Sequence, residues 1–110
     1  MKPPIIAVDA DGEVMIFMSQ RAAETTLEVN DLIADEYKFY DGEGRLLKAF
    51  PRGERNELVL VEAEHEASHQ ASVVKVLSVA LPKLPGAPSE LRGWGFQELI
   101  QLASKYAKGS

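Results

Sequence analysis

The stretch EYKFYDGEGRLLKAF, residues 36–50, decides the fold. Two runs rich in aromatic and aliphatic residues, 36–40 and 45–50, flank the tetrapeptide DGEG. Gly44 stands where a tight turn requires a left-handed residue, a conformation that glycine adopts without steric cost. The stretch therefore predicts a β-hairpin, and it makes antiparallel pairing the starting point for the rest of the sheet.

A second hairpin of the same kind is predicted nearer the N-terminus. The runs IIAV (5–8) and EVMIFM (13–18) flank DADG, and Asp-Gly supports positive φ at a tight turn. Both turns read D-x-x-G with an acidic third residue. The run ELVLVEA (57–63) is rich in β-branched residues and adds a fifth strand. Two similar hairpins indicate a meander rather than a solenoid, because the pattern does not occur a third time.

Helical patterns occupy the remaining segments, and three helices are predicted over residues 19–29, 64–81 and 89–107. Ser89 is a good N-cap for the last helix, although nearby glycines weaken its start, so its solid part is expected from Phe96. The order ββαβββαα predicts an α+β fold, with helices packed on one face of a mainly antiparallel sheet of about five strands. At 110 residues the chain is expected to form a single domain, residues 1–110.

Composition and charge restrict the class of partner. The chain has no cysteine, so a thiolate zinc site or a disulfide framework is impossible, and a reducing cytoplasm is the expected compartment. The N-terminal apolar run is too short for a signal peptide or a membrane span. Residues 1–66 carry 15 acidic and 7 basic side chains, a net charge of −8, whereas residues 67–110 carry 2 and 5, a net charge of +3. The acidic part disfavours nucleic acid binding and favours a basic protein partner. The run SVVKVLSVALPKL has too little positive charge for a membrane-binding helix, so no membrane binding is expected.

His65, Glu66 and His69 form the motif H-E-x-x-H. On a helix, two histidines four residues apart share a face and can bind one zinc ion, while the glutamate acts as general base. Glu90 or Glu98 would have to supply the third ligand. The order of elements resembles the core of small zincin peptidases, so a minimal zinc peptidase is the alternative interpretation. The same residues can also be the acidic start of a helix that binds no metal, and the run of glutamates favours this interpretation.

Two further motifs have a structural explanation beside the functional one. The run IIAVDADGEV resembles the first motif of haloacid-dehalogenase-type phosphatases, with Asp9 as nucleophile and Asp11 as acid/base. Glu13 departs from that motif and no later pair of aspartates follows, so the hairpin turn explains the run better. In GWGF (93–96), Trp94 is either an exposed anchor for a partner or part of the core, and core packing is the expected role.

The segment from Met15 to Leu47 resembles small bacterial immunity-type proteins of polymorphic toxin systems, through its strand, its short Ala-rich helix and the pattern E-Y-x-x-Y-D-x-x-G-R-x-L. The resemblance covers about a third of the chain. It implies a cytoplasmic inhibitor that binds a cognate toxin domain. The absence of an assembled catalytic set makes a non-enzymatic module without a cofactor the expected function, and the acidic part of the chain suits a basic toxin domain. The acidic residues expected to contact such a partner are Asp35, Glu36, Asp41, Glu43, Glu62 and Glu64.

Overall fold

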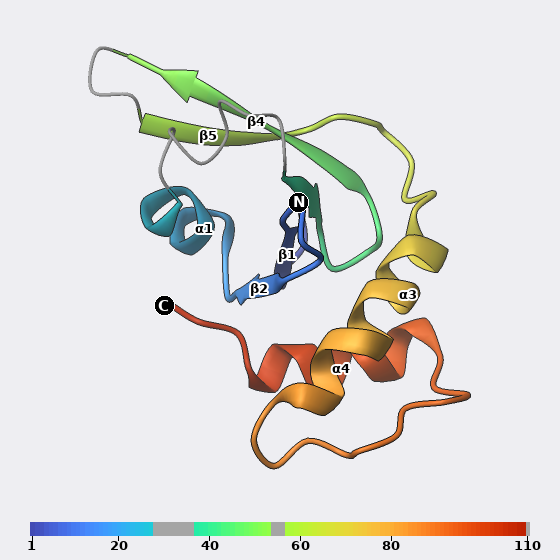
Figure 1. Cartoon of the computed structure of the whole chain (residues 1–110). Coiled ribbons are helices and arrows are strands. Elements are labelled where there is room, and N and C mark those ends of the chain that lie inside the picture. Colours follow the sequence, from blue (N-terminus) through green and yellow to red (C-terminus); the bar gives the residue numbers. More distant parts are fainter. Residues whose placement is uncertain (28–36, 54–56, 110) are drawn as a thin grey trace.

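A five-stranded antiparallel sheet forms the centre of the protein, with strand order β2-β1-β3-β4-β5 (Figure 1). The computed structural model describes residues 1–27, 37–53 and 57–109. The strands are β1 (Ile5–Val8), β2 (Val14–Phe17), β3 (Lys38–Tyr40), β4 (Leu46–Arg52) and β5 (Glu57–Glu62). The helices are α1 (Gln20–Thr26), α3 (Gln70–Ala80) and α4 (Phe96–Lys105), and the 3-10 turn η1 (Leu81–Lys83) continues α3.

The two predicted hairpins are confirmed. Val8 pairs with Val14 across the first turn, and Tyr40 pairs with Leu46 across the second. Strand β1 lies between β2 and β3, so the two hairpins join through antiparallel pairing of β1 with β3. The α+β class, the five strands and the order of elements are therefore as expected.

Alternate residues of the strands enter two cores on opposite faces of the sheet. On one face, Ile6, Ile16 and Tyr40 pack with the apolar side chains of α3 and α4. On the other face, Ile5, Ala7, Phe17, Phe39, Leu47, Leu58 and Leu60 pack with Ala22 and Ala23 of α1. The expectation that the helices share one face thus holds for α3 and α4 alone. The two-residue period of a strand makes this division possible, because successive side chains point to opposite faces.

The helix boundaries differ from the sequence pattern at two N-termini. Helix α1 begins as predicted, with the Ser19 Oγ accepting the N–H of Ala22. Helix α3 begins at Gln70 with His69 as N-cap, so the prediction of a helix from residue 64 is wrong for residues 64–69. Helix α4 begins at Phe96, where its solid part was expected, and Glu98 accepts the N–H of the N-cap Gly95. No helix in the described ranges has the length and apolarity needed to cross a bilayer.

Both outer strands of the sheet have backbone groups that bind neighbouring segments. On β5, the Leu60 N–H donates to the Glu24 carboxylate at 2.7 Å, and the Leu60 carbonyl accepts from the Gln20 side-chain amide at 3.0 Å. On β2, the Lys108 N–H donates to the Ile16 carbonyl, and the Met18 N–H donates to the Lys108 carbonyl. Backbone groups that are occupied in this way do not accept an added strand.

Candidate protein-binding surface

The turn between β3 and β4 is built around the carboxylate of Asp41. Its Oδ1 accepts the N–H groups of Glu43 and Arg45, both at 2.9 Å, and its Oδ2 lies 3.0 Å from Arg45 Nη1. The Asp41 side chain is completely buried. The expectation that Asp41 contacts a partner is therefore wrong, because its carboxylate is used inside the protein.

The turn between β1 and β2 repeats this geometry. Asp9 Oδ1 accepts the N–H groups of Asp11 and Glu13, both at 2.9 Å, and the Asp9 carbonyl accepts the N–H of Gly12. In each turn the glycine has positive φ, +84° at Gly12 and +88° at Gly44. The D-x-x-G pattern is thus a hairpin signature, and it accounts for Asp9 and Asp11 as turn residues.

Carboxylates gather on the outer side of the second turn, where β5 ends. We name Glu43, Glu62, Glu64 and Glu66 the acidic corner; all four side chains are solvent-accessible. Arg45 lies among them, with Nη2 3.4 Å from Glu43 and Nη1 3.6 Å from Glu62. Asp35 and Glu36, the other two acidic residues expected to contact a partner, lie outside the described residues. The structure therefore brings together three of the six expected residues, Glu43, Glu62 and Glu64, on one accessible corner.

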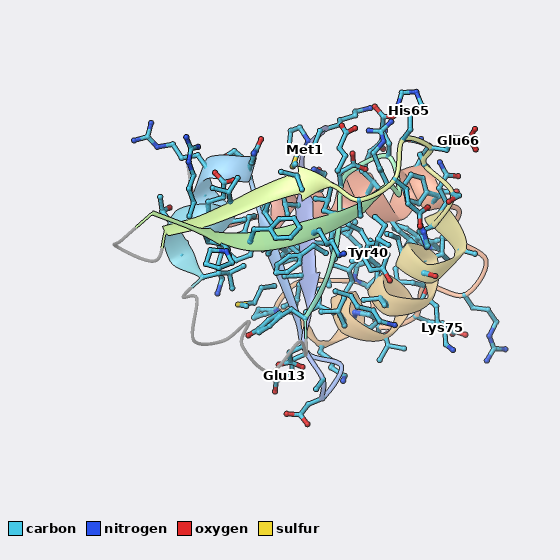
Figure 2. All side chains as sticks on the ribbon, turned by 90° about the horizontal axis from the view of Figure 1, so that it is seen from above. Met1, Glu13, Tyr40, His65, Glu66 and Lys75 are labelled. Atoms are coloured by element: carbon cyan, nitrogen blue, oxygen red, sulfur yellow. The ribbon has the colours of Figure 1, made fainter. Side chains whose placement is uncertain are left out.

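The H-E-x-x-H residues do not lie on a helix, which removes the geometric basis of the zinc interpretation. His65 and Glu66 stand at the outer edge of the loop between β5 and α3 (Figure 2). The His65 carbonyl accepts from Arg45 Nε, while the His69 ring nitrogen Nε2 lies 3.1 Å from Glu64 Oε2. The spacing of four residues places two side chains on one face only when the backbone between them is helical.

The residues proposed to complete a zinc site are used elsewhere. Glu90 pairs with Arg92 at 3.6 Å, and Glu98 caps the start of α4. In the parts of the chain that the structure describes, no three His, Asp or Glu side chains lie close enough to hold a metal ion. The arrangement does not bring His65, His69 and either glutamate together as ligands.

Among the described residues, no helix covers one face of the β4–β5 hairpin. We name Lys48, Phe50, Val59 and Val61 the open face. Phe50 pairs with Val59 and Lys48 with Val61, and the Lys48 ammonium lies 5.9 Å from the centre of the Phe50 ring. Phe50 is 47% exposed and Val61 39% exposed. In Figure 2, seen from above, none of the described helices α1, α3 and α4 lies in front of this hairpin.

The open face was not among the residues expected from sequence, although a signal for it exists. The run Leu58–Val61 is apolar at four successive positions, so it has an apolar residue on each face. Such strands are expected where a sheet is covered on both sides. Here Leu58 and Leu60 enter the core beside α1, and the opposite side chains remain accessible.

No protein-family model matches the chain, and neither a characterised protein nor a solved structure shows significant similarity to it.

Proposed function

We propose that the protein is a non-enzymatic protein-binding module of immunity type, which inhibits a cognate bacterial toxin domain in the cytoplasm. The observation that carries this proposal is the open face with the acidic corner beside it. Val61 belongs to the open face, and the adjacent Glu62 belongs to the acidic corner. Apolar side chains rimmed by charged ones are typical of protein-binding sites.

The two parts of this surface have different physical roles. The Phe50 ring and the Val61 side chain provide apolar area that a partner can desolvate, and this sets the lifetime of a complex. The acidic corner adds a negative potential, which the net charge of −8 over residues 1–66 reinforces. Such a potential accelerates the association with a basic partner and makes the rate depend on salt. A basic domain with an apolar recess is therefore the expected partner.

The backbone contacts at Leu60 and Ile16 occupy part of each sheet edge and so favour recognition through side chains. Leu60 on β5 and Ile16 on β2 have backbone groups already bound by Glu24, Gln20 and Lys108. A toxin domain that bound by adding a strand would have to displace these contacts. We therefore place the interface on the face of the β4–β5 hairpin and not on its edge.

Co-expression with the product of a neighbouring toxin-like gene tests the proposal. The parent protein is expected to restore growth of cells that express the toxin domain, and to co-purify with it. The variant Phe50→Ser/Val61→Ser is expected to weaken binding about 100-fold, since two central apolar anchors each contribute about 1–2 kcal/mol. Val79→Ser is the matched control, because Val79 is 60% exposed but lies on α3.

A charge variant tests the acidic corner separately. Glu64→Gln/Glu66→Gln is expected to reduce the association rate and its salt dependence, whereas Glu90→Gln, at an exposed position in the segment that precedes α4, is not. A genome without any toxin-like gene near this one, or a toxin domain that binds the Phe50→Ser/Val61→Ser variant as tightly as the parent, would overturn the proposal.

A further inference from the structure

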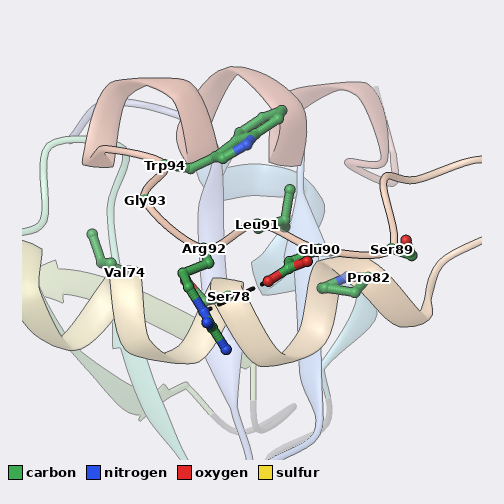
Figure 3. A pocket seen from close by; sticks show the side chains of 9 residues that line it. All are labelled: Val74, Ser78, Pro82, Ser89, Glu90, Leu91, Arg92, Gly93 and Trp94. Atoms are coloured by element: carbon green, nitrogen blue, oxygen red, sulfur yellow. Dashed lines mark ion pairs between the residues drawn. The ribbon is translucent and has the colours of Figure 1, made fainter.

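A cavity of about 330 Å³ lies between α3 and the segment that precedes α4 (Figure 3). Val74 and Ser78 of α3 and Pro82 of η1 form one wall. Residues 89–94 form the other wall, with Leu91 and Trp94 as its apolar members. The volume is at the lower end of the range for small-ligand sites, so it suits one compact apolar group.

A tight turn holds the second wall in place. The Trp94 N–H donates to the Leu91 carbonyl at 3.1 Å, and Gly93 between them has a φ of +85°. A turn of this kind needs glycine at its third position, because a side chain disfavours positive φ there. The Leu91 side chain is buried in the core with α3 and α4. Arg92 is thereby presented at the mouth of the cavity by an anchored backbone (Figure 3).

The Arg92 guanidinium is available to a ligand. Its Nε lies 3.6 Å from Glu90 Oε1, and the two side chains are 90% and 71% exposed. Such an exposed pair is weak, since water screens it and both side chains lose freedom in forming it. Among the described residues, Arg92 has no other partner. Its two Nη groups therefore remain free to bind a carboxylate in the bidentate geometry that guanidinium favours.

Glu90 and Arg92 both line the cavity, and cations outnumber anions in the part of the chain that forms it. Residues 67–110 carry a net charge of +3, in contrast with the acidic first part of the chain. Lys75 and Lys83 are exposed and directly follow the wall residues Val74 and Pro82. The hydroxyl groups of Ser78 and Ser89, also in the wall, add donors that a carboxylate oxygen can accept from.

We propose that this cavity binds an apolar carboxylate, with Arg92 holding the carboxylate and Leu91, Trp94 and Val74 contacting the apolar group. The ligand is either a free branched-chain acid or the C-terminal residue of a peptide, which present the same chemistry. The inference is independent of the proposed toxin inhibition, since the cavity uses α3 and residues 89–94 and the open face uses β4 and β5.

Trp94 is the only tryptophan of the chain, so its fluorescence reports on the cavity without background from another site. N-acetyl-leucine is the probe, and N-acetyl-leucinamide is its uncharged counterpart. The acid is expected to change the fluorescence with a Kd on the order of 1 mM, as suits a ligand of this size. The amide and the variant Arg92→Gln are expected to bind about three- to fivefold more weakly, because each lacks one partner of a solvent-exposed ion pair.

Control measurements separate binding from general charge effects and identify the source of the carboxylate. Arg21→Gln, at an exposed position of helix α1, is expected to bind N-acetyl-leucine like the parent, and unchanged melting temperatures show that the variants fold. A pentapeptide with C-terminal leucine that binds at least about tenfold tighter than N-acetyl-leucine identifies a peptide C-terminus as the ligand, whereas equal affinity identifies a free acid.

The proposal is overturned if the amide binds as well as the acid, or if Arg92→Gln binds like the parent. It is also overturned if the acid changes neither the Trp94 fluorescence nor the amide NMR signal of Gly93 at concentrations up to about 20 mM, well above the expected Kd.

Discussion

Arg45 Nη1 lies 3.0 Å from Oδ2 of the fully buried Asp41, and the same guanidinium donates through Nε to the His65 carbonyl at 3.0 Å. Through these contacts one side chain joins the β3–β4 turn to the loop that leads into α3. A buried carboxylate that accepts several hydrogen bonds and pairs with a cation is compatible with a stable fold. Removal of the cation lowers the free energy of unfolding, because the charge then remains buried without a counterion. The ion pair is therefore a structural centre of the fold, directly beneath the proposed binding surface.

Arg45→Met is expected to lower the free energy of unfolding by about 3 kcal/mol, because it leaves the Asp41 carboxylate buried without its cation. Urea denaturation of the parent and the variant measures this change. Arg21→Met is the control, since Arg21 is exposed on α1, and we expect a change below about 0.5 kcal/mol for it. Equal stability of Arg45→Met and the parent would contradict the assigned role.

Gly44→Ala is expected to destabilise the protein more than Gly12→Ala, by about 1–3 kcal/mol. Both glycines have the same left-handed backbone, so the conformational strain is shared by the two variants. A Cβ at Gly44 would lie 2.6 Å from Gln70 Cγ and 3.0 Å from the Gln70 backbone, whereas a Cβ at Gly12 would have no atom within 4 Å. Thermal melts of the two variants separate the contact from the strain, and equal losses would show that the contact with α3 is unimportant.

Glu24→Ala is expected to lower the free energy of unfolding by about 1–3 kcal/mol, because the Leu60 N–H loses its carboxylate acceptor. The variant is also expected to self-associate at high concentration, since part of the β5 edge becomes free to pair. Glu13→Ala is the control, as Glu13 is exposed and takes part in its turn through its backbone N–H. Thermal melting and size-exclusion chromatography measure the two effects, and a variant that remains as stable as Glu13→Ala would argue against the contact.

Tyr40 makes the stability sensitive to alkaline pH. Burial raises the pKa of the Tyr40 phenol, and a side-chain hydrogen bond with Ser72 lowers it in part. Up to about pH 9 the phenol is protonated in both the folded and the unfolded chain. As the pH rises past about 10, the unfolded chain loses this proton first, so the free energy of unfolding falls until the pH passes the raised pKa of the folded state.

The free energy of unfolding of Tyr40→Phe is therefore expected to fall less than that of the parent between about pH 9 and pH 11. At pH 9 the variant is expected to be less stable than the parent by about 1 kcal/mol, because it lacks the hydrogen bond with Ser72. Urea midpoints over this range measure the difference. Tyr106→Phe is the control for alkaline effects that do not depend on Tyr40. Parallel curves for the parent and Tyr40→Phe would show that the Tyr40 proton is not linked to folding.

The hairpins were predictable because their determinants are local. Asp9 and Asp41 bind N–H groups two and four residues along the chain, and the glycine at the fourth position takes the left-handed conformation. These features recur wherever the same residues occur. The conspicuous pattern Y-D-x-x-G-R, which carries the family resemblance, is explained by the buried Asp41–Arg45 pair, so a structural need accounts for it without a shared partner.

The start of α3 was not predictable from periodicity, because distant residues determine it. The His69 N–H donates to the Gly44 carbonyl, and the Gln70 side-chain amide donates to the Glu43 carbonyl. These contacts join positions about 25 residues apart, and they hold residues 64–69 as a loop despite the glutamates that suit a helix start. The burial of Asp41 and the exposure of Phe50 depend on the same tertiary arrangement. The sequence alone therefore predicted an exposed Asp41 carboxylate and did not predict an exposed Phe50 ring.

The partly occupied edges of the sheet have a consequence for the divergence of this protein. Backbone pairing recognises almost any extended segment, whereas recognition through side chains depends on which residues stand on the face. In this fold Lys48, Phe50, Val59 and Val61 face solvent on strands whose opposite side chains form the core beside α1. Under the proposed function, substitutions at these four positions would exchange one partner for another while the core keeps its composition, so variants with new specificities would share a constant scaffold.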